Sequence, residues 1–133
     1  MEILFTKPSP RAYNNLRKSS GIGGEKNLEP TEIALENSLF IVSIYDNNKL
    51  IGFGRIVGDG GITYVVSDIM VDKSHQGKGL GKLIMTKINR YFEENCNEEC
   101  YISLIANKPA DKLYSKFKFN YLKDFEVGMK RKK

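Results

Sequence analysis

The chain has 133 residues, of which 41% are hydrophobic and 28% are charged. This composition is typical of one globular domain, here residues 1–133, and excludes a disordered chain. Two cysteines and one histidine are too few for a usual zinc site without a carboxylate, so we expect no metal. The net charge is only +5, and Lys130 to Lys133 supply much of it, which argues against a nucleic-acid-binding surface.

No apolar run approaches the ~20 residues that span a bilayer, so we expect no membrane partner. Residues 1–7 lack the charged start and long apolar stretch of a secretory signal. The sequence therefore predicts a cytoplasmic protein, in which Cys96 and Cys100 are free thiols.

The first third of the chain predicts a short edge strand at residues 3–5 and then two helices. Ser9 and Pro10 are typical of an N-cap and a first-turn proline. The first helix should end near Gly21, and a second, shorter helix should begin near Pro30.

Three apolar, strand-like runs follow, at residues 39–45, 50–57 and 62–71. Clusters of Asn, Asp and Gly separate them and predict short turns. Short turns between strands favour an antiparallel meander.

The third of these runs breaks its own alternation. Tyr64 and Val66 share one face, and Asp68 would fall on that face too, before three consecutive apolar residues. A polar residue on the more buried face predicts a bulge near residues 67–70. A bulge frees backbone N–H groups, which could hold a ligand carbonyl.

The second half predicts a long amphipathic helix, whose apolar stripe is Leu80, Leu83, Ile84, Ile88, Tyr91 and Phe92. A strand at residues 101–106 would make a parallel strand–helix–strand unit with the run before the helix. A further helix should start at Pro109, and residues 119–121 and 126–129 predict a closing pair of short strands. The fold class is therefore α/β (α+β), a mixed and mostly antiparallel sheet with helices on both faces.

A glycine- and lysine-rich loop lies between the third run and the long helix, at residues 72–79. Glycines let the backbone approach a ligand, and the helix start offers unpaired N–H groups and a positive dipole end. Together with Lys73, Lys78 and Lys82, these features predict a phosphate site rather than a solvated turn. We interpret His75 as a solvent-side loop residue.

The spacing of this loop excludes a Walker A motif and fits the dinucleotide fingerprint poorly. Gln76, Gly79 and Gly81 match the pattern [QR]-x-x-G-x-[GA], and the loop resembles the pyrophosphate loop of the GNAT superfamily of N-acetyltransferases. A second motif of that family resembles the segment made by Asn107, Ala110, Leu113, Tyr114 and the Phe117-to-Phe119 end. Lys118 stands there where the family usually has a glycine.

The resemblance implies a sheet whose parallel strand–helix–strand unit forms the acetyl-CoA cleft. It implies transfer of an acetyl group from acetyl-CoA directly to a primary amine of a small molecule or peptide. Backbone groups of Ile69, Met70 and Val71 would hold the pantetheine arm and the thioester carbonyl, and Asn107 would contact the arm from the opposite strand. The pyrophosphate would be held by Gln76, Gly77, Lys78, Gly79, Leu80, Gly81 and Lys82.

By the same resemblance, Tyr114 would be the general acid that protonates the departing thiolate. A phenol of pKa about 10 suits that role, although Tyr114 could also be a core aromatic. Asp68 is the candidate base for the incoming ammonium, but it could instead position structure or act through water.

The acceptor side falls in residues 13–38 by the same likeness. Glu25, Glu29, Glu32 and Glu36 recur there and form either a solvated helix face or a surface that attracts a cationic amine. The alternative to an enzyme is a catalytically silent CoA-binding sensor or interaction module of the same fold. A homodimer is compatible with the resemblance.

Overall fold

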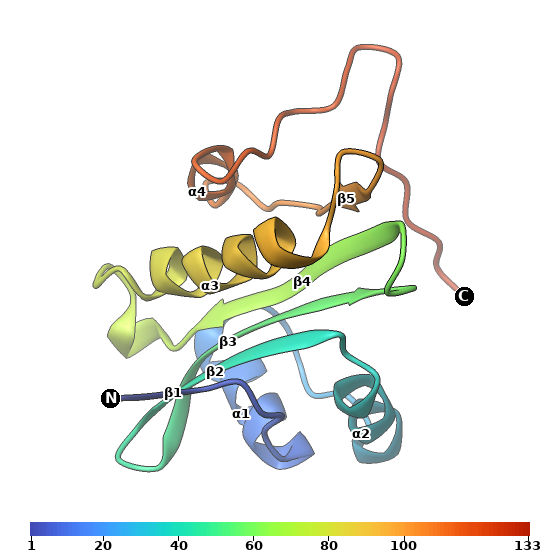
Figure 1. Ribbon diagram of the computed structural model, residues 1–133. Coiled ribbons are helices and arrows are strands. Elements are labelled where there is room, and N and C mark those ends of the chain that lie inside the picture. Colours follow the sequence, from blue (N-terminus) through green and yellow to red (C-terminus); the bar gives the residue numbers. More distant parts are fainter.

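The computed structural model describes residues 1–133 as a five-stranded sheet with helices on both faces (Figure 1). The strands are β1 (Glu2–Leu4), β2 (Phe40–Asp46), β3 (Lys49–Gly58), β4 (Thr63–Val71) and β5 (Tyr101–Ser103). The helices are α1 (Pro10–Ser20), α2 (Leu28–Glu36), the 3-10 helix η1 (Lys73–His75), α3 (Leu80–Asn95) and α4 (Asp111–Ser115). None of these helices is both long and apolar enough to span a membrane.

The strands lie side by side in chain order, β1-β2-β3-β4-β5. The first three pairings are antiparallel, and only β4 and β5 run parallel, with α3 as their crossover. The expected mixed, mostly antiparallel sheet with one parallel strand–helix–strand unit is confirmed.

Helix α1 begins and ends as its sequence predicts. Ser9 accepts a hydrogen bond from the backbone N–H of Ala12 at 3.1 Å, and Pro10 occupies the first turn. Gly21 closes the helix in the left-handed region, with φ of 83°. These local signals determine the residues at which α1 begins and ends, independently of its packing.

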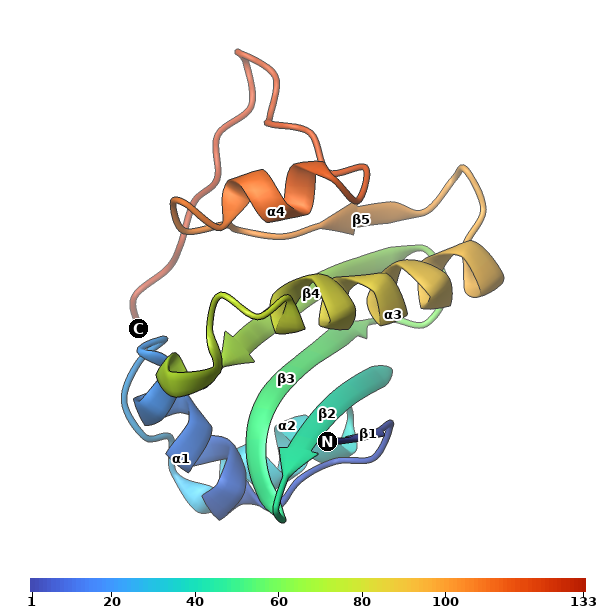
Figure 2. The same ribbon diagram turned by 90° about the vertical axis from the view of Figure 1, so that its left-hand side faces the viewer.

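Two apolar clusters hold the helices to opposite faces of the sheet (Figure 2). Ile84, Met85 and Ile88 of α3 are fully buried against one face. On the other face, Tyr13 and Leu16 of α1 pack with Phe53 and other sheet residues. The α1–α2 side and the α3 side of the sheet are therefore separate layers.

The predicted bulge is present in β4. Phe53 pairs with Met70 and Arg55 with Ser67, so Asp68 and Ile69 together oppose Gly54. Asp68 has φ of 56°, a left-handed conformation that is uncommon for a residue with a side chain. The extra residue turns Asp68 to the α1 side, whereas Tyr64 and Val66 pack in the α3-side cluster.

β4 and β5 pair over three positions only, Thr63 with Tyr101 through Val65 with Ser103. Beyond Val65 the two strands separate, so β5 is shorter than the strand predicted at residues 101–106. The physical reason is that residues 104–106 have no strand beside them once β4 turns into its bulge.

The closing strands predicted at residues 119–121 and 126–129 are wrong. This segment forms no strand, and its contacts are local: the N–H of Glu126 bonds to the Lys123 carbonyl at 2.8 Å. The Tyr121 hydroxyl donates to the Asp111 carboxylate in α4. The apolar alternation that suggested strands is exposed, as at Phe125 and Val127.

Candidate active site

The loop before α3 presents a run of backbone donors. No backbone N–H from Gly77 to Lys82 makes a hydrogen bond within the chain. Gly77 and Gly79 have φ of 79° and 84°, and a Cβ at either position would meet no atom within 4 Å. The two glycines therefore border open space, and the unpaired donors lie at the positive end of a helix of 16 residues. The arrangement fits a pyrophosphate.

The side chain of Gln76 holds this loop to the end of β4. Its Nε2 donates to the Val71 carbonyl at 2.8 Å, so the side chain turns back toward the sheet. The motif glutamine thus fixes the loop, and the backbone is left to meet a ligand.

A second anchor, which the sequence reading missed, is Asp72. Its side chain is buried, and its carboxylate accepts hydrogen bonds from Ser74 and from His75 Nδ1, the latter at 2.9 Å. These bonds hold the pKa of Asp72 well below its ordinary value of 3.8. His75 Nε2 also lies 3.5 Å from Asp46, so His75 links the loop to the β2–β3 turn rather than to solvent alone. The available signal in the sequence was an acidic residue directly after a predicted strand.

Where β4 and β5 separate, a cavity of about 370 Å³ opens between them. Asp68 and Ile69 line it from β4, and Leu104 and Asn107 line it from the segment after β5. A neighbouring cavity of about 260 Å³ runs to the glycine loop and is lined by Gln76, Gly79 and Gly81 among others. Both cavities share Ile69, Ala110 and Tyr114. They form one path along the strand gap.

Tyr114 of α4 lies at the junction of these two cavities. Only 9% of the residue is exposed, yet its hydroxyl makes no hydrogen bond within the chain. Burial raises the pKa of Tyr114 above its ordinary value of 10.0, so the phenol is protonated at neutral pH. A protonated, unpartnered hydroxyl beside the path can donate a proton to a bound group.

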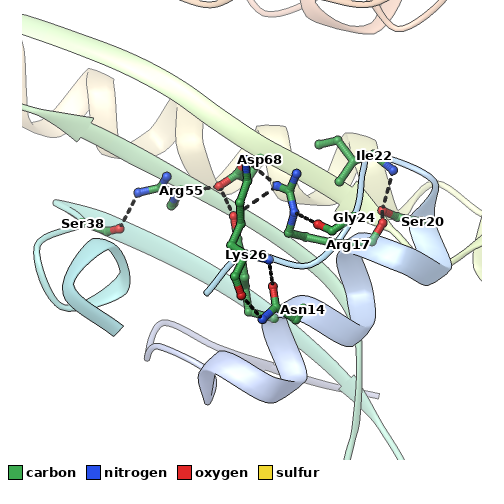
Figure 3. A network of polar contacts seen from close by, with 10 residues as sticks. Asn14, Arg17, Ser20, Ile22, Gly24, Lys26, Ser38, Arg55 and Asp68 are labelled. Atoms are coloured by element: carbon green, nitrogen blue, oxygen red, sulfur yellow. Dashed lines mark hydrogen bonds and ion pairs between the residues drawn. The ribbon is translucent and has the colours of Figure 1, made fainter. Parts of the chain in front are cut away.

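Asp68 sits at the other end of the gap within a cluster that the sequence reading missed (Figure 3). Its Oδ2 accepts from the Tyr13 hydroxyl at 2.6 Å and from Arg55 Nε at 2.8 Å. Arg17 Nη1 lies 3.7 Å from Oδ1. Oδ2 is therefore engaged by two hydrogen bonds, whereas Oδ1 has only the longer ion pair with Arg17.

The structure thus brings most of the expected site residues to one path. Its cavities are lined by Ile69, Val71, Asn107, Tyr114 and, from the loop, Gln76, Gly77, Gly79, Leu80 and Gly81. Lys78 and Lys82 line neither cavity, and the side chain of Met70 is buried on the α1 side. The four glutamates lie away from it: Glu32 and Glu36 pair with Lys7, and Glu25 pairs with Lys18 at 2.9 Å.

Residues 10–119 match the family model "Acetyltransferase (GNAT) family". A probable acetyltransferase of unknown function from methicillin-resistant Staphylococcus aureus superimposes with a TM-score of 0.92 and 42% identity, over 99% of this chain and 98% of that one. A GNAT-family acetyltransferase from Streptococcus pneumoniae has a TM-score of 0.75 and 25% identity, covering 99% of this chain and 98% of that one.

Among curated proteins, the uncharacterized N-acetyltransferase ycf52 of Pyropia yezoensis is 31% identical over 106 residues, which is 77% of this chain. The match covers 60% of the length of that relative, so most but not all of its chain has a counterpart here. The family match spans both the glycine loop and Tyr114. This chain belongs to the GNAT family of acetyltransferases.

Proposed function

We propose that this protein transfers an acetyl group from acetyl-CoA to the primary amine of a small molecule. The observation that carries the proposal is the position of Tyr114, which lines both the cavity at the glycine loop and the cavity beside Asp68 and whose hydroxyl has no partner within the chain. Residues 1–133 would act as one transferase domain, in the cytoplasm, and as a monomer or homodimer.

The run of N–H groups from Gly77 to Lys82 would hold the pyrophosphate of the coenzyme. Lys78 and Lys82 are exposed on the same loop and helix start and would add positive charge. Backbone groups of Ile69, Met70 and Val71 would position the pantetheine arm, with Asn107 on the opposite side. This arrangement would leave the acetyl group near the bulge.

Acetyl-CoA supplies a thioester: the amine nitrogen bonds to its carbonyl carbon, the C–S bond breaks, and the amide and free CoA result. Tyr114 donates its hydroxyl proton to the sulfur as that bond breaks, and recovers a proton from solvent. A backbone N–H at the bulge stabilises the negative charge that builds on the carbonyl oxygen, an effect worth about 3–4 kcal/mol. The proton that the amine loses goes to water or to Asp68.

We propose that Asp68 acts chiefly as a positioning residue. Two hydrogen bonds to Oδ2 and the ion pair of Oδ1 with Arg17 hold the carboxylate between α1 and the sheet, which favours a positioning role. A base role would fall to Oδ1, which accepts no hydrogen bond within the chain.

The test is an assay of the purified protein with acetyl-CoA and a panel of primary amines. Release of the CoA thiol and the mass of the acetylated amine are followed together, with a reaction lacking amine as the control for hydrolysis. Formation of an N-acetyl product, at a rate that depends on the amine, supports the proposal. Stabilisation by acetyl-CoA without product from any amine would instead favour a silent CoA-binding module.

A further inference from the structure

A cavity of about 770 Å³ adjoins the strand gap on the α1–α2 side of the sheet. It shares Ile22 and Asp68 with the gap cavity, so it lies where an acceptor would approach the bulge. Its size falls in the range of small-molecule sites. Its charged lining is cationic, with Asp68 as the single acid beside Arg17, Lys26, Arg55 and Lys130.

Two of these cations are nearly buried and share one carboxylate. The side chains of Arg17 and Arg55 are 11% and 16% exposed, and that of Asp68 is 13% exposed. Asp68 can neutralise only one guanidinium, so one positive charge has no anion. The remaining contacts are with neutral groups: Arg17 donates to the Gly24 carbonyl at 2.8 Å, and Arg55 to Ser38 Oγ at 3.3 Å. Burying an unbalanced charge is costly unless a partner arrives.

Lys26 and Lys130 add further positive charge to the lining of this cavity. Asn14 fixes the backbone of Lys26 through hydrogen bonds of 2.8 and 2.9 Å (Figure 3), and Lys26 lines the same cavity as the two arginines. Lys130 reaches the same cavity from the C-terminal segment. Neither lysine forms an ion pair within the chain.

We propose that the acceptor is a small amine that also carries an anionic group, a carboxylate or a phosphate. This inference rests on the proposed acetyl transfer. Arg17, Arg55 and Lys26 would bind the anion, because guanidinium–oxyanion hydrogen bonds are among the strongest in proteins. The amine at the other end of the substrate would then reach past Asp68 toward the strand gap.

This assignment argues against the alternative in which the glutamates attract a cationic amine. Glu25, Glu32 and Glu36 pair with exposed lysines outside the cavity. A dication such as 1,4-diaminobutane would meet repulsion from the cavity lining instead.

The first experiment compares matched amines as substrates with acetyl-CoA. O-phosphoethanolamine and β-alanine carry the anion, ethanolamine lacks it, and 1,4-diaminobutane replaces it with a cation. We expect kcat/KM for at least one anionic amine to exceed that for ethanolamine by about tenfold or more. Whichever anionic amine has the higher kcat/KM shows whether the cavity prefers a phosphate or a carboxylate. Equal or faster acetylation of ethanolamine or diaminobutane would overturn the inference.

The second experiment measures binding alone, by calorimetric titration of the same amines into the protein with CoA present. Anion-dependent binding without any turnover would retain the anion-binding site and reject the proposed acetyl transfer. Turnover of neutral amines without anion-dependent binding would support acetyl transfer and reject the anion-binding site.

The variants are Lys26→Gln and Arg55→Lys, with Lys87→Gln as the control. Lys87 lies on α3, which packs on the opposite face of the sheet from α1 and α2 (Figure 2), and it does not line the cavity. We expect Lys26→Gln to raise KM for the anionic amine about tenfold and to leave KM for ethanolamine unchanged. Arg55→Lys retains the charge but loses the planar fork, so a smaller loss with the same selectivity is expected. An equal effect of Lys26→Gln and Lys87→Gln would contradict the assignment.

Discussion

The Tyr13 hydroxyl donates a 2.6 Å hydrogen bond to the carboxylate of Asp68, a residue 55 positions later in the chain. This bond joins helix α1 to the bulge of β4. Burial, and then the hydrogen bond to Asp68, raise the pKa of Tyr13, so the phenol remains a donor at neutral pH. The cavity on the α1–α2 side and the cavity between β4 and β5 therefore meet at one carboxylate.

Removing this hydroxyl tests how strongly the two parts are joined. We expect Tyr13→Phe to lower the free energy of unfolding by about 1.5–3 kcal/mol, because the lost bond is to a charged acceptor. Tyr45→Phe is the matched control, since Tyr45 packs against the same cluster and its hydroxyl has no partner within the chain. Urea unfolding of both variants measures the difference, and equal stabilities would contradict the prediction.

A positioning role for Asp68 predicts a particular kinetic outcome. In Asp68→Asn we expect KM for the amine to rise, while the acid limb of the kcat/KM profile stays in place. If Asp68 were the base, that limb would disappear and kcat would fall. Asp68→Glu keeps the charge, and partial recovery of KM in that variant would exclude a simple folding defect.

The proposed general acid is tested by Tyr114→Phe. We expect kcat to fall about 100-fold, the lower range for general acid catalysis, while the affinity for CoA is unchanged. Tyr91→Phe is the control, because Tyr91 is half-buried, its hydroxyl also lacks a partner within the chain, and it lines none of the cavities described. Steady-state kinetics give kcat, and titrations with CoA give its affinity. An unchanged kcat in Tyr114→Phe would show that Tyr114 is not the general acid.

The conformation of the glycine loop predicts the effect of a single methyl group. Gly79→Ala meets no atom within 4 Å, so its cost arises from the left-handed backbone, roughly 1–2 kcal/mol. We expect weaker binding of acetyl-CoA, because the loop would relax toward another backbone shape. Gly128→Ala, which also has open space but no positive φ, should bind normally. Calorimetric titration of acetyl-CoA into both variants compares them.

Asp72 makes stability depend on pH in a defined direction. Its pKa is depressed in the folded protein, so its stabilising effect is complete above its ordinary value of 3.8 and is lost as the pH falls below it. At neutral pH, Asp72→Asn should lower the free energy of unfolding by about 2 kcal/mol. The difference in Tm between wild type and variant should narrow below about pH 4. A constant difference from pH 7 to pH 3 would show that the charge of Asp72 is not responsible.

Much of the fold follows from signals that lie close together in the sequence. Ser9, Pro10 and Gly21 fix α1, and the misplaced polarity of Asp68 predicts the bulge. The glycine loop and Tyr114 could be found from motif spacing. These features depend on neighbouring residues, which is why sequence reading reaches them.

The missed features depend on contacts between distant parts of the chain. Nothing near Arg17 or Arg55 in the sequence shows that both will meet Asp68. The exposed alternation around Phe125 predicted a strand because sequence reading cannot see that no partner strand lies beside it. Likewise, the spacing of the glutamates gives no sign that Lys7 and Lys18 will pair with them.

If the proposed pyrophosphate site is correct, the unpaired donors from Gly77 to Lys82 provide a direct measure of its occupancy. Their amide protons should exchange with deuterium at nearly the rate of an unfolded chain, because no internal bond must break first. The amides of Ile84 and Ile88, only a turn or two further along α3, lie in a buried helix and should exchange far more slowly. A bound pyrophosphate would abolish that contrast, so deuterium uptake in one short peptide can follow loading of the site without any catalytic assay.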